Sequence, residues 1–242
     1  MKAEYIDHFG SDLDVVNDAK VSFAKASTEV GEKEIALINY LARGIPSKEF
    51  EELIADLAQE VDIARVKTIV NQLTRTATHW VPFAHNGIKL KMAAPIPIRV
   101  HCFKHKIGFV ESEESRRYIS STPELYIPTE FHIRPKNIKQ GSSNDISEHS
   151  SYYIKRYTHS CKRAISLYEE MINVGIAPEE ARYILPQGVI VNWRWTGNLA
   201  AFARYYNQRS DSHAQKDDNE LAEQVRNIIE ALFPYSWKAL TE

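Results

Sequence analysis

The chain has few of the residues that build the commonest functional motifs. It holds two cysteines and nine glycines among 242 residues. Cys102 and Cys161 form no CxxC pair, which argues against a disulfide framework and favours a reducing compartment. No two glycines occur as G-x-G, and the P-loop, GxSxG and HExxH patterns are absent. These absences exclude the usual dinucleotide fold, P-loop enzymes, serine hydrolases and HExxH zinc proteases.

Long apolar runs and an excess of one charge are also missing. No run approaches the roughly 18 apolar residues that cross a bilayer, and the N-terminal residues lack the apolar core of a signal peptide. We therefore predict a cytoplasmic protein that does not contact membranes. Lys and Arg total 30 against 32 Asp and Glu, a net charge of −2. This balance argues against a protein that binds nucleic acids in general, but it does not exclude a local basic patch.

Hydrophobic periodicity predicts helices interspersed with strands. The helices are predicted at 14–26, 33–42, 47–60, 63–74, 160–174, 178–185, 196–209 and from about 217 to 232. Strands are predicted at 87–94 and 188–193, residues 98–109 fit either structure, and 136–150 resembles a mobile loop. The predicted class is therefore α/β (α+β), in one domain spanning 1–242 with a helical subregion at about 33–75.

The densest group of polar side chains lies between His101 and Tyr118. It combines lysines, arginines and serines, which are the donors that a phosphate or pyrophosphate requires. A solvated charged surface explains the same composition. His101 and His105 have the HxxxH spacing of zinc ligands, but no third ligand or supporting motif accompanies them, so no metal site is predicted.

A second polar group extends over residues 198–215. If one helix covers it, a narrow stripe contains Asn198, Phe202, Tyr205, Arg209 and His213. Two interpretations are open. Arg209 binds a polar ligand ring on which the aromatic side chains stack, or the stripe is a helix–helix interface in which Arg209 pairs with an acid, such as Asp211 or one on a neighbouring helix.

Together these segments resemble the flavin-dependent thymidylate synthases. The family signature, an RHR triplet followed by S, N/E, S, R and Y, stands here as Lys104-His105-Lys106 and then Ser112, Glu113, Ser115, Arg117 and Tyr118. The segment from Arg209 to Gln215 (RSDSHAQ) is similar to the second signature. Blocks at 14–23, 80–85, 139–142 and 179–186 also match, so the resemblance covers nearly the whole chain.

The resemblance implies a fold and an activity. The fold is a mixed sheet packed by helices, in a homotetramer whose active sites lie where subunits meet. The activity is that of a methyltransferase that converts dUMP to dTMP. Methylenetetrahydrofolate supplies the carbon, and FAD reduced by NADPH supplies the reducing equivalents. Neither a metal nor a cysteine nucleophile is implied.

Residue roles follow from position within the matched motifs. Arg209 is expected to be catalytic, contacting the uracil ring and stabilising its ionised N3 form. The residues expected to hold dUMP are His101, Lys104, Glu113, Ser115, Arg116, Arg117, Arg182 and Arg209. Those expected to contact FAD are Ser22, His79, Lys104, His105, Lys106, Glu113, Asn198, Arg204 and His213.

Several positions depart from the family pattern. Lysines replace both arginines of the triplet, which keeps the charge but loses the bidentate fork. His101 stands where glutamine is usual, and Ala84 and Ala200 stand where Glu and Arg are usual on the flavin side. Three alternatives remain open: a degenerate member that holds FAD weakly, a non-catalytic nucleotide- or RNA-binding module, and a metal hydrolase built on His101 and His105.

Overall fold

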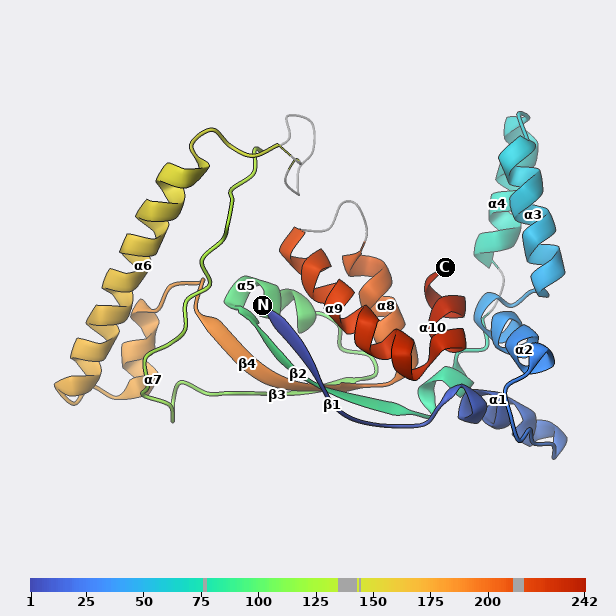
Figure 1. The fold of residues 1–242 in the computed structure, drawn as a ribbon, viewed down its shortest axis with the longest axis horizontal. Helices are drawn as coiled ribbons and strands as arrows, with labels where there is room; N and C mark the ends of the chain where they lie inside the picture. The colour runs from blue at the N-terminus through green and yellow to red at the C-terminus, as the bar shows by residue number, and fades with distance from the viewer. Residues whose placement is uncertain (76–77, 135–142, 144, 211–215) are drawn as a thin grey trace. The chain divides into compact units, whose positions relative to one another are not determined.

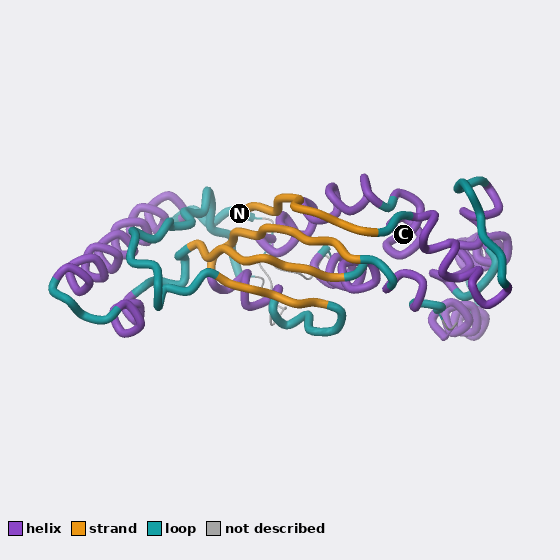
Figure 2. Tube along the Cα trace, turned by 90° about the horizontal axis from the view of Figure 1, so that it is seen from below, coloured by secondary structure: helices purple, strands orange, loops and turns teal. Residues whose placement is uncertain are grey.

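The fold combines one sheet with helices from all parts of the chain. The computed structural model describes residues 1–75, 78–134, 143, 145–210 and 216–242. Its four-stranded sheet has the order β1-β2-β4-β3, and the strands lie side by side in Figure 2. They are β1 (Lys2–Phe9), β2 (Gly87–Pro95), β3 (Phe109–Glu113) and β4 (Ile190–Gly197). The predicted α/β class, a sheet packed by helices, is confirmed.

The central strands show why these segments form a sheet. Along β2, Leu90 and Met92 are fully buried, whereas Lys89 and Lys91 between them are exposed. Along β4, Trp193 and Trp195 are buried and Arg194 between them is exposed. This alternation places one side of each strand in the core and the other in solvent.

Helices connect and flank the strands (Figure 1). Those that precede β2 are α1 (Asp12–Lys20), α2 (Glu32–Arg43), α3 (Ser47–Gln59) and α4 (Ile63–Arg75). Those that follow are α5 (Ile96–Cys102), α6 (Ser150–Asn173), α7 (Pro178–Ala181), α8 (Leu199–Arg209), α9 (Lys216–Leu232) and α10 (Pro234–Thr241). Short 3₁₀ helices cover Val21–Phe23, Val81–Ala84 and Arg182–Ile184.

The chain divides into two compact units. The first contains residues 1–7, 89–196 and 205–226, and the second contains residues 8–88, 197–204 and 227–242. In the first unit, α5 and the first turns of α9 lie on the same side of the sheet (Figure 1). In the second, α2 packs on α10, and α3 lies beside α4. The assignment of 1–242 to a single domain stays a prediction.

Local signals explain where the helices of the second unit begin and end. Gly44 ends α2 with φ 75°, a left-handed conformation that glycine adopts without strain. The Asp62 carboxylate accepts hydrogen bonds from the backbone of Ala64 and Arg65, which caps the start of α4. The predicted helices at 33–42, 47–60 and 63–74 are confirmed within one or two residues.

Several elements differ from the sequence prediction. Helix α1 covers Asp12–Lys20 rather than 14–26, and residues 196 and 197, predicted as the start of a helix, belong to β4. Helix α6 begins at Ser150, ten residues before the predicted start at Ser160, because its first turns carry exposed tyrosines and basic residues rather than an apolar stripe. Strands β1 and β3 and helix α10 were not predicted; all are short and rich in polar or aromatic residues. Much of the predicted loop at 136–150 lies outside the described residues.

A buried carboxylate joins the start of α10 to α1. Asp12 is 5% exposed. Its Oδ2 accepts a hydrogen bond from Tyr235 N at 2.9 Å, and its Oδ1 accepts one from Ser236 N at 2.9 Å. These amides belong to the first turn of α10, where no carbonyl within the helix is available to them. Asp12 therefore caps a helix more than 200 residues away in sequence.

A second polar cluster fixes the segment between α1 and α2. The Glu34 carboxylate accepts hydrogen bonds from Lys20 Nζ at 2.9 Å and from Ser27 Oγ at 2.8 Å. Its other oxygen accepts from Gly31 N at 3.3 Å, at the start of α2. Lys20 and the Ser27 hydroxyl lower the pKa of Glu34 to about 2.

Replacing Asp12 with alanine is expected to lower the free energy of unfolding by about 1–3 kcal/mol, because two buried amides lose their acceptor. Urea unfolding followed by circular dichroism measures the change. Glu29→Ala, at an exposed position, serves as the control and is expected to stay within about 0.5 kcal/mol of wild type. An Asp12→Ala variant that is as stable as wild type would contradict the capping role of Asp12.

The lowered pKa of Glu34 predicts a stability loss in acid. The contribution is fully present above the ordinary value of 4.5 and disappears as the pH falls from there toward about 2. Glu34→Gln is therefore expected to be less stable than wild type at pH 6, with the difference shrinking below pH 4.5. Thermal unfolding at several pH values tests this, and a difference independent of pH would contradict it.

Candidate functional site

Arg209 is the last residue of α8, and its guanidinium contacts the end of α5. Its Nε donates a hydrogen bond to His105 Nε2 at 3.1 Å. Its Nη2 donates to the backbone carbonyl of His101 at 3.1 Å. The side chain is 20% exposed. Arg209 is therefore held on two sides while part of its fork still faces solvent.

A buried acid on α9 completes this cluster. Asp218 Oδ2 lies 2.7 Å from His101 Nδ1 and 3.9 Å from Arg209 Nη1. The Asp218 side chain is 2% exposed, and its burial raises the pKa of the carboxyl, an effect that the His101 hydrogen bond and the Arg209 charge oppose. We call His101, His105, Arg209 and Asp218 the arginine cluster.

The structure bears on both interpretations of the 198–215 segment. Phe202 and Tyr205 are buried in the core, which is the environment of packing residues. Ligand binding by Arg209 stays a prediction. Arg209 pairs with an acid on a neighbouring helix, as the helix–helix interpretation predicted, although the acid is Asp218. Helix α8 ends at Arg209, and Asp211 and His213 lie outside the described residues.

Four predicted dUMP residues line a pocket beside β3. The pocket has a volume of about 440 Å³, and its walls include Glu113, Ser115, Arg116 and Arg182. Arg99 also lines it, and its Nε lies 3.2 Å from Glu113 Oε2. Partial burial raises the pKa of Glu113, while the Arg99 charge opposes the shift. We call this the β3 pocket; its positive groups and hydroxyl suit an anionic ligand.

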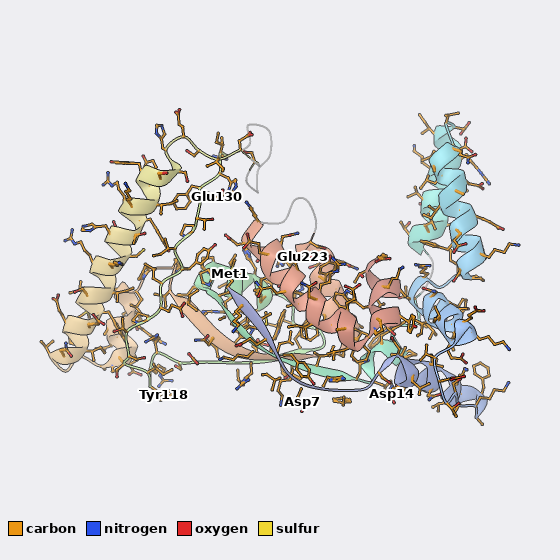
Figure 3. All side chains as sticks on the ribbon, viewed as in Figure 1. Met1, Asp7, Asp14, Tyr118, Glu130 and Glu223 are labelled. Atoms are coloured by element: carbon orange, nitrogen blue, oxygen red, sulfur yellow. The ribbon has the colours of Figure 1, made fainter. Side chains whose placement is uncertain are left out.

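Two predicted nucleotide residues, Lys104 and Arg117, lie outside the arginine cluster and the β3 pocket, at the surface. Arg117 Nε donates to Glu179 Oε2 at 3.1 Å, and its guanidinium lies over the ring of Tyr118, which Figure 3 labels. Arg182 Nε donates to the backbone carbonyl of Glu179 at 3.1 Å. Glu179 thus connects the segment after β3 to α7. Lys104 is exposed.

The predicted FAD residues divide between the two units. Lys104, His105, Lys106 and Glu113 belong to the first unit, and Lys106 pairs there with Glu111. The second unit holds Ser22, His79, Asn198 and Arg204. In that unit the His79 ring stacks on Tyr40 at 5.6 Å, and Asn198 Oδ1 accepts from Ala201 N at 2.9 Å. Asn198 therefore caps α8, and Ser22 and Arg204 are exposed.

Sequence reasoning missed two charged residues that the structure brings into these sites. Asp218 is one of two adjacent acids at the start of a helix, and no motif distinguishes it from Asp217. Asp217 lies inside α9, where its Oδ1 accepts a hydrogen bond from Tyr126 OH at 2.9 Å. Arg99 occurs within an ambiguous segment. Only its position on α5 shows that it faces Glu113.

Another hollow of about 570 Å³ lies beside the start of α9 in the first unit. Tyr126, Glu130, Tyr157 and Lys216 are among its walls, and Lys216 Nζ lies 2.6 Å from Glu130 Oε1. The charges of Lys216 and Glu130 thus compensate each other. Among the described residues, no group of three or more His, Cys, Asp or Glu side chains could hold a metal ion, and no described helix is long and apolar enough to cross a membrane.

Neither cysteine is arranged as a nucleophile. Cys102 and Cys161 are both buried. Burial raises the pKa of the Cys102 thiol to about 12, and it also raises the pKa of Cys161. Since the thiolate is the reactive form, both groups stay protonated near neutral pH.

The native protein is therefore expected to react slowly with a thiol reagent such as DTNB at pH 8. After unfolding in guanidinium, both thiols should react rapidly. A colorimetric titration with and without denaturant measures this. One thiol that reacts at once in the native state would contradict the burial of that cysteine.

The chain is similar to a known family and to several of its members. It matches the Thy1 family, described as thymidylate synthase complementing protein, over residues 4–235. A flavin-dependent thymidylate synthase from Thermosipho africanus is 30% identical over 165 residues, which cover 66% of this chain and 71% of that protein. One from Thermotoga neapolitana is 26% identical, over 98% of this chain and 88% of that protein.

The fold also resembles a solved structure. PolB, a UMP/dUMP methylase from Streptomyces cacaoi bound with 5-Br dUMP, superposes with a TM-score of 0.76 at 23% identity. The superposition covers 99% of this chain and 94% of that one, so the two share a fold throughout. The family match spans both the arginine cluster and the β3 pocket. The chain belongs to the Thy1 family of thymidylate synthase complementing proteins.

Proposed function

We propose that this protein is a flavin-dependent thymidylate synthase that methylates dUMP to dTMP. Methylenetetrahydrofolate is the carbon donor, and FAD reduced by NADPH is the source of reducing equivalents. The observation that carries the proposal is the family match over residues 4–235, which includes every residue of the arginine cluster and the β3 pocket. The proposed assembly is a homotetramer with active sites at subunit interfaces.

The β3 pocket supports the nucleotide half of the proposal. Its volume of about 440 Å³ is in the usual range for small-molecule sites. Arg116 and Arg182 supply positive charge, and Ser115 supplies a hydroxyl donor. These groups suit the phosphate of dUMP. Glu113, whose carboxyl is half-buried beside Arg99, can accept a hydrogen bond from the deoxyribose hydroxyl.

Arg209 is suited to stabilise negative charge on a pyrimidine ring. His105 and the His101 carbonyl fix its guanidinium, so little reorganisation is needed when a ligand binds. Only 20% of its side chain is exposed, and this partial burial strengthens its interaction with an anion. In the proposed reaction Arg209 binds the uracil ring and favours the N3-ionised form.

The residues predicted to hold FAD fit its chemistry. The exposed Lys104 and the neighbouring Lys106 can neutralise the pyrophosphate, with Arg204 as a further exposed cation. His79, Asn198 and Ser22 offer polar contacts. When bound, FAD would carry the reducing equivalents that convert the transferred carbon to a methyl group. Ala200, where arginine is usual, is buried in α8 and offers no contact to a phosphate.

The direct test incubates purified protein with FAD, NADPH, methylenetetrahydrofolate and dUMP, and measures dTMP by liquid chromatography. Arg209→Ala is expected to keep the fold but to lose about 10²–10³ in turnover, because charge on the ring loses its fixed cation. Arg163→Ala, an exposed arginine on α6, serves as the matched control and is expected to retain turnover.

Three outcomes separate the alternatives. No dTMP from wild type would remove the synthase assignment, and near-normal turnover by Arg209→Ala would remove Arg209 from the mechanism. A visible spectrum after desalting shows whether flavin is retained. Protein that binds dUMP but neither retains FAD nor forms dTMP would be a degenerate member or a nucleotide-binding module.

A further inference from the structure

Asp218 is a buried charge that no predicted role uses. Its side chain is 2% exposed, yet it lies in the first turn of α9 beside the proposed uracil-binding arginine. Burying a carboxylate is costly unless hydrogen bonds and opposite charge compensate. Here the compensation comes from His101 on α5 and Arg209 on α8, so one carboxylate links three helices.

The hydrogen bond to Asp218 determines which nitrogen of His101 carries a proton. Asp218 Oδ2 and His101 Nδ1 are 2.7 Å apart. Because a carboxylate can only accept, Nδ1 is the donor, and Nε2 of the neutral ring is then an acceptor. Among the described residues, no partner of Nε2 is found, and the side chain is 36% exposed. His101 therefore presents an oriented acceptor to a ligand.

The Asp218 carboxylate also attracts Arg209, but it does not form a hydrogen bond with it. The distance of 3.9 Å between Asp218 Oδ2 and Arg209 Nη1 allows charge attraction but no hydrogen bond. A guanidinium has five N–H donors; one on Nε and one on Nη2 are used within the described residues. The His101 contact is much shorter than the Arg209 contact, so Nη1 makes no hydrogen bond to Asp218 and stays available to a ligand.

We propose that Asp218 is a positioning residue for the nucleotide site: it orients His101 Nε2 and holds the Arg209 fork for the pyrimidine of dUMP. This inference rests on the proposed function. It has a specific consequence, because His101 stands where glutamine is usual in the family. His101→Gln alone should be harmful here, since Asp218 loses its short hydrogen bond and attracts Arg209 instead.

The test is a double-mutant cycle on dUMP binding. Wild type, Asp218→Asn, His101→Gln and the double variant are incubated with FAD, and the Kd for dUMP is measured by calorimetry without turnover. Each single variant is expected to bind about tenfold or more weakly, the loss typical of a hydrogen bond to a charged group. The double variant should be no weaker than the weaker single variant, because both changes remove one interaction.

Asp217→Asn is the matched control. Asp217 occupies the same first turn of α9, but its carboxylate contacts Tyr126, so dUMP binding should change by less than about twofold. Wild-type affinity in Asp218→Asn, an equal loss in Asp217→Asn, or additive losses in the cycle would each overturn the inference. Each variant is first checked for thermal unfolding, which separates a folding defect from a binding defect.

A second measurement uses the wild-type protein. Nitrogen-15 NMR of the histidine side chains, with His101 assigned from His101→Gln, is expected to show the Nδ1–H tautomer when the ring is neutral. An Nε2–H tautomer would overturn the inference whatever the variants do. If wild type binds dUMP and the double-mutant cycle gives the expected result, but no dTMP forms, the proposed function is contradicted while the role of Asp218 stands. Wild type that binds no dUMP would contradict both.

Discussion

The aromatic contacts on β4 determine where the arginine cluster can form. The Trp195 ring stacks on Phe109 with centroids 4.3 Å apart, and Tyr205 meets Trp195 edge-on at 4.9 Å. Tyr205 in turn contacts the His105 ring at 5.1 Å, and its hydroxyl lies 3.8 Å from Cys102 Sγ. Buried rings of this size fit only one arrangement well. They therefore fix the end of α5 against the last turns of α8.

Three helix ends then meet with complementary polarity. His101 lies in the last turn of α5, His105 follows three residues after that helix, and Arg209 is the last residue of α8. Such ends favour positive charge, whereas Asp218 occupies the first turn of α9, which favours negative charge. The packing of the rings thus brings opposite charges to the helix ends that stabilise them. Arg209, which stays partly exposed, can then bind a ligand.

Periodicity predicted most of this fold because the helices have apolar stripes and β2 alternates. The elements it missed, β1, β3 and α10, gain their stability from partners distant in sequence, as the Asp12 cap of α10 shows. The site was predicted unevenly for a similar reason. Motifs pointed to Arg209 and to the residues of the β3 pocket, whereas Asp218 and Arg99 acquire significance only from contacts that no local pattern encodes.

The long-range bonds near the N-terminal strand have a consequence for synthesis on the ribosome. Ala3 N donates a hydrogen bond to Gln224 Oε1, and the Asp12 carboxylate accepts hydrogen bonds from the amides of Tyr235 and Ser236. These partners emerge from the exit tunnel more than 200 residues after the groups they bind. Neither compact unit can close until these late segments have been synthesised, so strand edges lack their neighbours for a long part of translation.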